Sequence, residues 1–158
     1  MAEAFYARLR AQQQHAVGCV LVASQAAGKT TWVKTQPDFV DADDLIGQYE
    51  PGNLQQMAAK VEDLVRLGAW VVTSTWWELR NFDGKVAVVS IPEEKLRHFA
   101  RKKKFDADEA VRQASLLTAA AKKEGIGVFP TFEAARFHAT LSLTTAYINN
   151  SRPKSQIP

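Results

Sequence analysis

The stretch CVLVASQAAGKTTW, residues 19–32, joins a short apolar run to a loop of small residues. The apolar, β-branched run over 17–22 predicts a strand that is buried on both faces, as in a parallel sheet, and a helix is expected to begin near Gly28. Such a loop lets several backbone N–H groups converge on one phosphate, because small side chains leave the approach open. Lys29 would add a mobile positive charge, and Thr30 a hydroxyl for magnesium. The predicted phosphate-binding residues are Ser24, Gln25, Ala26, Ala27, Gly28, Lys29, Thr30 and Thr31.

The same loop matches the relaxed Walker pattern, with Ala23 in the place of the usual first glycine and then Gly28, Lys29 and Thr30. The alternative is that AAGKTT, residues 26–31, is only a tight turn between a strand and a helix. The strand expected before the loop and the helix expected after it are the context that the phosphate-binding motif requires. We therefore predict phosphate binding at this loop.

Strands and helices are expected to alternate along the rest of the chain. Further strands are predicted at 38–40, 69–76, 85–91 and 127–129, and helices at 2–15, 54–68, 92–104, 106–123 and 132–147. Asp106 with Glu109 is a capping pair at a helix start, and Gly68 and Gly125 are plausible helix ends. Each connection between strands is too long for a hairpin, which implies a parallel sheet covered on both faces. The expected fold is α/β, a three-layer sandwich with a five-stranded parallel sheet, in one domain over 1–148 with a polar tail over 149–158.

The composition suits a protein that folds without disulfides. A chain of 158 residues fits a single domain that needs no structural metal. The single cysteine, Cys19, lies in an apolar run and is expected to be a buried, inert thiol, which fits a reducing, cytoplasmic setting. We see no secretion leader and no apolar stretch of about 18 residues, so membrane spanning is not expected. The formal charge of +3 and the pI near 9.1 mildly favour anionic partners, nucleotides and nucleic acid among them.

The segment FVDADD, residues 39–44, places three acids at the end of the second predicted strand. Alternate residues of a strand point the same way, so Asp41 and Asp43 could act side by side. Together with the loop, the short chain and a basic helix after the fourth strand, this pattern resembles the small P-loop kinases, a group that includes shikimate, gluconate and nucleoside monophosphate kinases. The resemblance implies a P-loop NTPase fold, with ATP and Mg²⁺ bound at the loop.

In that family an acidic pair faces the phosphate loop. The resemblance implies that Asp41 assists the metal with Thr30, and that Asp43 orients or deprotonates the acceptor hydroxyl. The phage polynucleotide kinases carry an Arg, Asp, Asp run at the same place, and ADD at 42–44 matches its two acids but not its Arg. The alternative is that these acids cap a helix that starts near Asp44, because Asp is a preferred capping residue. A cap needs only one acid, and three within four residues exceed that need.

Arg97 and Arg101 stand one helical turn apart in EEKLRHFARKKK, residues 93–104. They could fold over the transferring phosphoryl group as cations of a lid over about 93–106, and would neutralise the charge that develops there. The alternative is a solvated basic helix end that compensates the helix dipole, and for Lys102 to Lys104 that interpretation is the better one.

The stretch TSTWWELR, residues 73–80, follows the third predicted strand. Many P-loop proteins carry a metal-binding acid at this strand end, whereas TST stands here at 73–75, which leaves open which acid completes the magnesium site. In the family this loop lines the acceptor pocket, so Trp76, Trp77 and Arg80 could stack on and clamp a planar acceptor such as a base. The alternative is that one Trp lies in the core and the other covers a helix.

These expectations combine into an ATP-dependent, magnesium-requiring kinase that passes the γ-phosphoryl group to a hydroxyl or phosphate of a small, anionic or nucleotide-like acceptor. Its expected catalytic residues are Lys29, Asp43, Arg97 and Arg101. One alternative is a kinase for nucleic acid, which would act on a 5′ hydroxyl or a modified base. The other is a nucleotide-binding module without catalysis, which the missing acid after the third strand favours and the Asp41 and Asp43 pair opposes.

Overall fold

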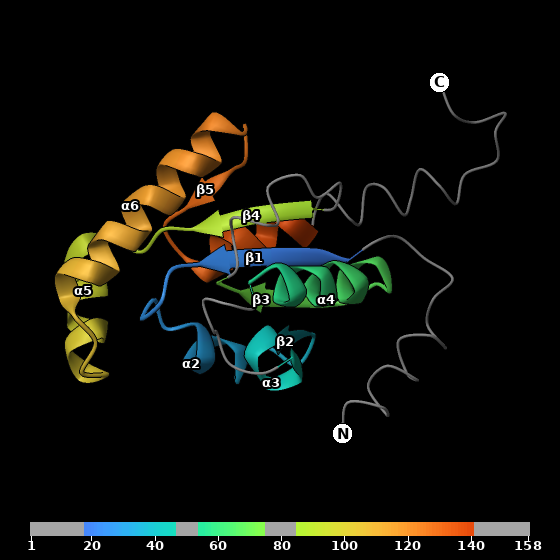
Figure 1. Ribbon diagram of the computed structural model, residues 1–158, viewed down its shortest axis with the longest axis horizontal. Coiled ribbons are helices and arrows are strands. Elements are labelled where there is room, and N and C mark those ends of the chain that lie inside the picture. Colours follow the sequence, from blue (N-terminus) through green and yellow to red (C-terminus); the bar gives the residue numbers. More distant parts are fainter. Residues whose placement is uncertain (1–17, 47–53, 75–84, 141–158) are drawn as a thin grey trace, which may run out of the picture.

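The computed structural model describes residues 18–46, 54–74 and 85–140 of the chain, and Figure 1 shows strands and helices alternating along them. The strands are β1 (Cys19–Ala23), β2 (Phe39–Asp41), β3 (Trp70–Thr73), β4 (Lys85–Val89) and β5 (Val128–Phe129). The helices are α2 (Lys29–Val33), α3 (Ala42–Ile46), α4 (Leu54–Arg66), α5 (Glu93–Lys102) and α6 (Ala107–Lys123), and a further helix covers 132–140.

The five strands form one parallel sheet in the order β2-β3-β1-β4-β5. β1 is the central strand, because Val20 pairs with Val71 of β3 on one side and with Val86 of β4 on the other. Every residue of β1 is buried, as its apolar run requires, since helices cover a central parallel strand on both faces. The α/β class and the five-stranded parallel sheet expected from the sequence are confirmed.

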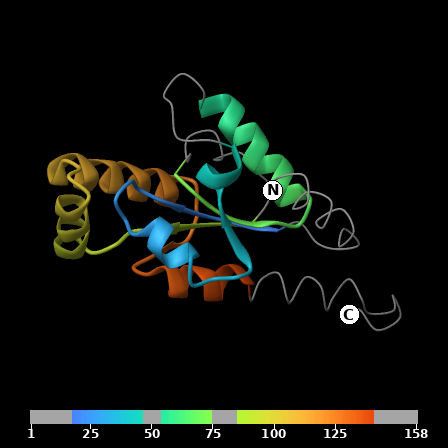
Figure 2. The same ribbon diagram turned by 90° about the horizontal axis from the view of Figure 1, so that it is seen from below.

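Successive side chains of the strands point to two apolar cores, one on each face of the sheet. On one face Leu21 lies in a cluster with Trp32 of α2 and Phe132 of the last helix. On the other face Val22 lies in a cluster with Leu64 of α4. Figure 2 shows α4 on one side of the sheet, and α2 with the 132–140 helix on the opposite side. This arrangement is compatible with a three-layer sandwich, and each fully buried Val or Leu contributes roughly 1.5–3 kcal/mol to its stability.

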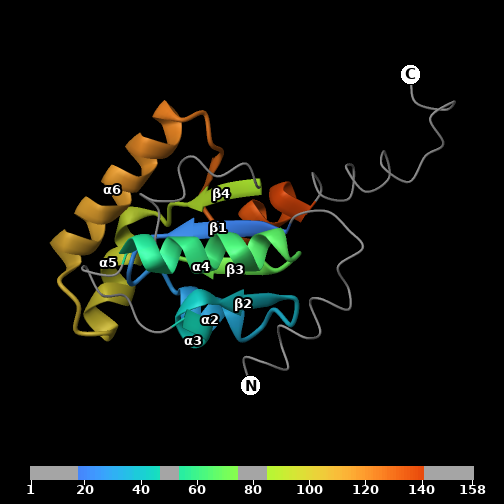
Figure 3. The same cartoon turned by 45° about the vertical axis from the view of Figure 1, so that its right-hand side comes forward.

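Helices α5 and α6 pack on one another near the carboxyl ends of the central strands (Figures 1 and 3). α5 buries Leu96 and Ala100, and α6 buries Ala110 among others. The side chain of Asp106 accepts a hydrogen bond from the backbone N–H of Glu109 at 3.1 Å, so the expected cap of α6 is confirmed. The segment 93–106 therefore lies at the same edge of the sheet as the loop that follows β1.

Three helices end in the same capping motif, in which a residue with positive φ reverses the chain. α4 is followed by Gly68 (φ 95°) and α6 by Gly125 (φ 72°), which have no β-carbon to clash. α5 has Lys104 (φ 56°) at the equivalent position. In each motif the next N–H donates to a carbonyl five residues earlier: Ala69 to Leu64 at 3.0 Å, Ile126 to Ala121 at 2.8 Å and Phe105 to Ala100 at 2.9 Å.

The observed elements differ from the expected ones mainly at their ends. β3 ends at Thr73 and β4 at Val89, earlier than the sequence suggested, because neither strand is followed directly by a glycine or proline that would mark its end. α3 begins at Ala42, directly after β2 and two residues before the start near Asp44 that the helix-capping alternative assumed. The expected leading helix, the end of the last helix and the tail lie outside the described residues, at 2–15, 141–147 and 149–158.

Candidate functional site

The carboxyl ends of β1, β2 and β3 bring buried polar residues to one edge of the sheet. Ser24 follows β1, Asp41 ends β2 and Thr73 ends β3, and all three are buried. The strand register places them close together, because Thr73 pairs with Val22 and Asp41 pairs with Val72. In open parallel sheets this edge is where ligands bind.

Lys29, at the start of α2, binds two carboxylates at this edge. Its Nζ donates to Asp41 Oδ1 at 3.0 Å and to Asp43 Oδ2 at 2.7 Å. The side chains of Lys29, Asp41 and Asp43 are 11%, 3% and 32% exposed. The ammonium and the first carboxylate are therefore shielded from water, which strengthens their attraction, while the second carboxylate is accessible. We call these residues, together with Thr30, the Lys29 cluster.

Asp41 caps a helix and also faces the start of α2, while its expected role in holding a metal stays a prediction. Its Oδ1 also accepts the backbone N–H of Asp43 at 3.0 Å, which makes Asp41 the N-cap of α3. Its Oδ2 lies 3.5 Å from Thr30 Oγ1. The helix-capping interpretation therefore holds for Asp41, and the same carboxylate also faces Lys29 and Thr30.

Asp43 reaches the cluster by a route that the sequence did not indicate. The two acids were expected to lie side by side on one strand, and that reasoning is wrong, because β2 ends at Asp41 and Asp43 is the second residue of α3. The turn from strand into helix brings both carboxylates to one ammonium. Asp44, the third acid of the segment, is exposed.

The loop between β1 and α2 is a tight turn built from small residues. Gly28 precedes α2 with φ 88°, and no side chain caps the helix there. Ala26 has φ 66°, a left-handed conformation that costs a residue with a β-carbon on the order of 1 kcal/mol. A β-carbon on Gly28 would lie 3.4 Å from the ring of Phe99, so α5 contacts the loop. The expected helix start near Gly28 is confirmed.

Arg97 and Arg101, the expected lid cations, lie on this same α5. Arg97 donates through Nε to Glu93 at 3.0 Å and through Nη1 to Asp108 of α6 at 2.7 Å. Asp108 first and then Glu93 raise the pKa of the Arg97 guanidinium by accepting its hydrogen bonds. Arg101 is exposed in the last turn of the helix. In this structure Arg97 joins α5 to α6, and its action on a phosphoryl group stays a prediction.

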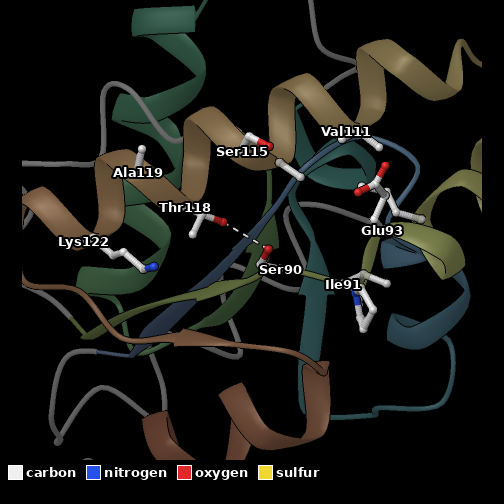
Figure 4. A pocket seen from close by; sticks show the side chains of 11 residues that line it. Ser90, Ile91, Glu93, Val111, Ser115, Thr118, Ala119 and Lys122 are labelled. Atoms are coloured by element: carbon white, nitrogen blue, oxygen red, sulfur yellow. Dashed lines mark hydrogen bonds between the residues drawn. The ribbon is translucent and has the colours of Figure 1, made fainter.

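A cavity of about 520 Å³ opens between the start of α5 and one face of α6. Figure 4 shows the hydroxyls of Thr118 and Ser90 facing one another in its wall, where Thr118 Oγ1 donates to Ser90 Oγ at 3.0 Å. Ser115 and Glu93 add further polar groups to the lining. Apolar walls come from Ile91, Leu96, Val111 and Ala114.

The cavity lies close to the loop between β1 and α2. Ser90 follows Val89 of β4, which pairs with Ala23, and Ala23 is followed by Ser24. Neighbouring strands are about 4.8 Å apart. Ser90 in the wall of the cavity and Ser24 at the start of the loop therefore follow neighbouring strands and lie side by side.

Several residues of this region could not be found from the sequence. A lone aromatic residue in a basic helix, Phe99, gives no sign that it faces the loop. Ser90 and Thr118 are 28 residues apart in the chain, and only the packing of α6 on the sheet joins them. Three expected acceptor residues, Trp76, Trp77 and Arg80, lie outside the described residues.

No protein-family model matches the chain, and no curated protein matches it. Within 18–46, 54–74 and 85–140, no group of three or more His, Cys, Asp or Glu could hold a metal ion. Over the same ranges, no helix has the length and apolar character needed to cross a membrane. The function is therefore inferred from the site itself.

Proposed function

We propose that the protein is an ATP-dependent kinase, which transfers the γ-phosphoryl group to a hydroxyl or phosphate of a small, nucleotide-like acceptor. The observation that carries this proposal is the Lys29 cluster, in which one ammonium, two carboxylates and a hydroxyl meet beside a loop of small residues. The resemblance of the loop and the acidic segment to small P-loop kinases supports the same chemistry, and with it a P-loop NTPase fold. A plain strand-to-helix turn has no need for a lysine and two acids.

The donor atoms of the cluster suit Mg²⁺. This ion prefers hard oxygen ligands, commonly one or two carboxylates, and obtains its remaining ligands from phosphates and water. Thr30 Oγ1 and Asp41 Oδ2 lie 3.5 Å apart, and the Asp41 carboxylate already holds one cation, the Lys29 ammonium. Thr30 and Asp41 would hold the ion, which when bound supplies positive charge beside the phosphates.

Lys29 and Mg²⁺ would compete for the same carboxylate. The ammonium lies 3.0 Å from Asp41 Oδ1, so a second cation on Asp41 would weaken the attraction that holds Lys29. The lysine would then be free to bind the outer phosphates of the nucleotide. Metal and nucleotide are therefore expected to bind cooperatively, because each favours the arrangement that the other needs.

Asp43 is the residue in the cluster that would prepare the acceptor, because its carboxylate is a third exposed. It would orient the acceptor hydroxyl and take its proton while the acceptor oxygen bonds to the γ-phosphorus. The bond from the γ-phosphorus to the bridging oxygen breaks in the same step, and ADP leaves. Lys29, with Arg97 or Arg101 from α5, would neutralise the charge that develops.

The cavity beside β4 would hold the nucleoside end of ATP. Its volume of about 520 Å³ lies within the usual range for ligand pockets, and its apolar walls with a few hydroxyls are typical of them. Ser90 stands one strand away from the start of the phosphate loop. A nucleotide with its phosphates at the loop could therefore extend into the cavity.

The transfer is tested by incubating the protein with labelled ATP, Mg²⁺ and a panel of nucleosides, nucleotides, oligonucleotides and metabolites. We expect label to appear on a nucleoside or nucleotide. Lys29→Ala should abolish transfer, and Lys34→Ala, at an exposed lysine at the other end of the same helix, should keep it. Lys29→Arg retains the positive charge beside Asp41, but a guanidinium binds phosphate in a different geometry from an ammonium. A Lys29→Arg protein that is folded and still fails to transfer would show that unfolding is not the cause.

Two results would contradict the kinase. Wild-type transfer by a folded Lys29→Ala protein would remove the Lys29 cluster from the reaction. ATP binding without transfer to any acceptor in the panel would favour the nucleotide-binding module instead.

A further inference from the structure

The end of α5 carries a group of cations that the proposed reaction does not use. They are three consecutive exposed lysines, which we call the basic turn: Lys102, Lys103 and Lys104. In the part of the chain that the structure describes, none of these side chains has an ion pair or a hydrogen bond. The acids that follow are engaged elsewhere, since Asp106 caps α6 and Asp108 binds Arg97. The three charges are therefore left for a partner.

The positive charge of the whole chain is concentrated around this turn. Residues 95–112 hold seven Lys and Arg against three Asp and Glu, and the other 140 residues hold thirteen against fourteen. A helix C-terminus carries only about half a negative charge, and Arg101 and Lys102 both stand in the last turn of α5. The helix dipole, which the sequence alone suggested as the reason for this basic end, therefore leaves Lys103 and Lys104 unexplained.

One position of the basic turn has a lysine in a backbone conformation for which the other two helix ends have glycine. The same capping position is Gly68 after α4 and Gly125 after α6, but Lys104 after α5, with φ 56°. A residue with a β-carbon in this conformation is disfavoured. A cation is thus kept at this position in spite of a conformational cost.

The basic turn is close to the phosphate loop and to an exposed ring. Lys103 follows Phe99 by four residues, about 6 Å along the helix axis, and the ring of Phe99 lies against Gly28. His98 is exposed and precedes Lys102 by one turn on the same face. The lysines, the exposed His98 ring and the contact of Phe99 with the loop therefore lie close together at this end of α5.

We propose that the basic turn is a docking surface for a single-stranded nucleic acid. Its adjacent lysines match the successive phosphates of a strand, because each neutralised phosphate releases a counterion and so favours binding. The exposed His98 ring gives an unpaired base a face on which to stack, which bases stacked in a duplex do not need. This surface goes beyond the proposed kinase function and does not depend on phosphoryl transfer.

The test is fluorescence anisotropy of a labelled single-stranded oligonucleotide of about twenty residues, without ATP, over a range of salt concentrations. We expect wild-type affinity to fall steeply with salt. Lys102→Gln/Lys103→Gln should weaken binding and make the slope of log affinity against log salt shallower by about 0.7 for each phosphate that is no longer neutralised. The matched control is Lys60→Gln/Lys123→Gln, which removes two exposed lysines from other helices and should leave both quantities unchanged.

Two further variants separate docking from folding. Lys104→Gly relieves the positive φ, so it should raise the melting temperature and still weaken oligonucleotide binding. His98→Ala should lower the affinity about fivefold or more if a base stacks on the ring. If the turn had only a structural role, Lys104→Gly would raise the melting temperature without weakening oligonucleotide binding.

The proposal is overturned if all variants bind the oligonucleotide as the wild type does, or if the wild type binds a duplex more tightly than the single strand. Binding to phosphatidylserine vesicles in place of the oligonucleotide would also overturn it. Unchanged oligonucleotide binding by Lys29→Ala, together with abolished ATP binding, would show that docking stands independently of the kinase site.

Discussion

At the scale of single residues, the buried carboxylate of Asp41 connects most parts of the candidate site. It accepts hydrogen bonds from the Lys29 ammonium and from the backbone N–H of Asp43, and its second oxygen faces Thr30. Its neighbour Asp43 shares the ammonium but is a third exposed. The two acids should therefore respond differently to the same substitution.

Asp41→Asn is expected to lower the free energy of unfolding by about 1–3 kcal/mol, because it leaves the shielded Lys29 ammonium with a weaker partner. It should also raise the Mg²⁺ concentration needed for transfer. Asp43→Asn should leave the melting temperature nearly unchanged and lower kcat by about 10²–10⁴-fold, as expected for loss of a general base. Thermal denaturation measures the stability of each variant, and steady-state kinetics measure its kcat and its Mg²⁺ requirement. Similar effects of the two variants on both quantities would show that the roles are not divided.

Cys19 gives a prediction on pH dependence. Burial raises the pKa of its thiol to about 12 from an ordinary value near 9, and the charge of Arg136 opposes this shift only in part. Between these values the native state keeps the proton that the unfolded chain loses. Stability that is present below pH 9 is therefore lost as the pH rises towards 12, by up to about 1.4 kcal/mol per pH unit.

The thiol prediction is measured by urea denaturation at pH 8 and pH 10. Wild type should lose more stability between these two values than Cys19→Ala, which has no thiol to titrate. Equal losses in the two proteins would contradict the raised pKa of the thiol.

At the scale of elements, the junctions between strands and helices determine the site more than their centres do. The turn from β2 into α3 brings Asp43 to Lys29, and the turn from β1 into α2 forms the loop. The start of α5 and the adjoining face of α6 enclose the cavity. Substitutions on the cavity face of α6 should therefore affect nucleotide binding without touching the cluster.

Ser115→Trp is expected to weaken binding of a non-hydrolysable ATP analogue by about tenfold, 1.4 kcal/mol, because the indole would occupy the cavity. Leu116→Trp is the matched control: it is the next residue on the same helix and also exposed, but it does not line the cavity. Isothermal titration calorimetry compares the two variants. Equal affinities would place the nucleoside end of ATP elsewhere.

At the scale of the whole molecule, two apolar cores pack against the two faces of the sheet, and the candidate site lies at the carboxyl ends of its strands. The core side chains on the two faces belong to separate clusters, so β1 is fixed from both sides. The loop and the cluster stand at the end of this rigid strand. A ligand that binds there should stabilise the entire fold, since the native state alone presents the assembled site.

ATP with Mg²⁺, at one hundred times its dissociation constant, should add about 2.7 kcal/mol to the free energy of unfolding and raise the melting temperature by roughly 5–10 °C. ATP without the metal should give a smaller shift, because Lys29 then stays bound to Asp41. Differential scanning fluorimetry measures the shift. Lys29→Ala should lose it and Lys60→Ala should keep it, and a shift that survives in Lys29→Ala would place the nucleotide away from the cluster.

Local sequence was enough to predict the fold class, the buried strand β1, the loop with its helix start and the helix ends at Gly68 and Gly125. These features depend on apolar runs, small residues and backbone preferences, which act over a few neighbouring positions. The acids at 41 and 43 were likewise visible as a segment.

The assembly of the site, in contrast, depended on how the elements pack. Packing joined Lys29 to Asp41 and Asp43, set Phe99 against Gly28, and brought Ser90 to Thr118. Each of these contacts links residues from separate elements, and no local pattern encodes the packing of one element on another. Packing also placed Arg97 beside Asp108, to which it donates a hydrogen bond. The sequence had suggested an arginine that acts on phosphate. The difference arises because the helix that packs beside a charged side chain determines which partner it meets.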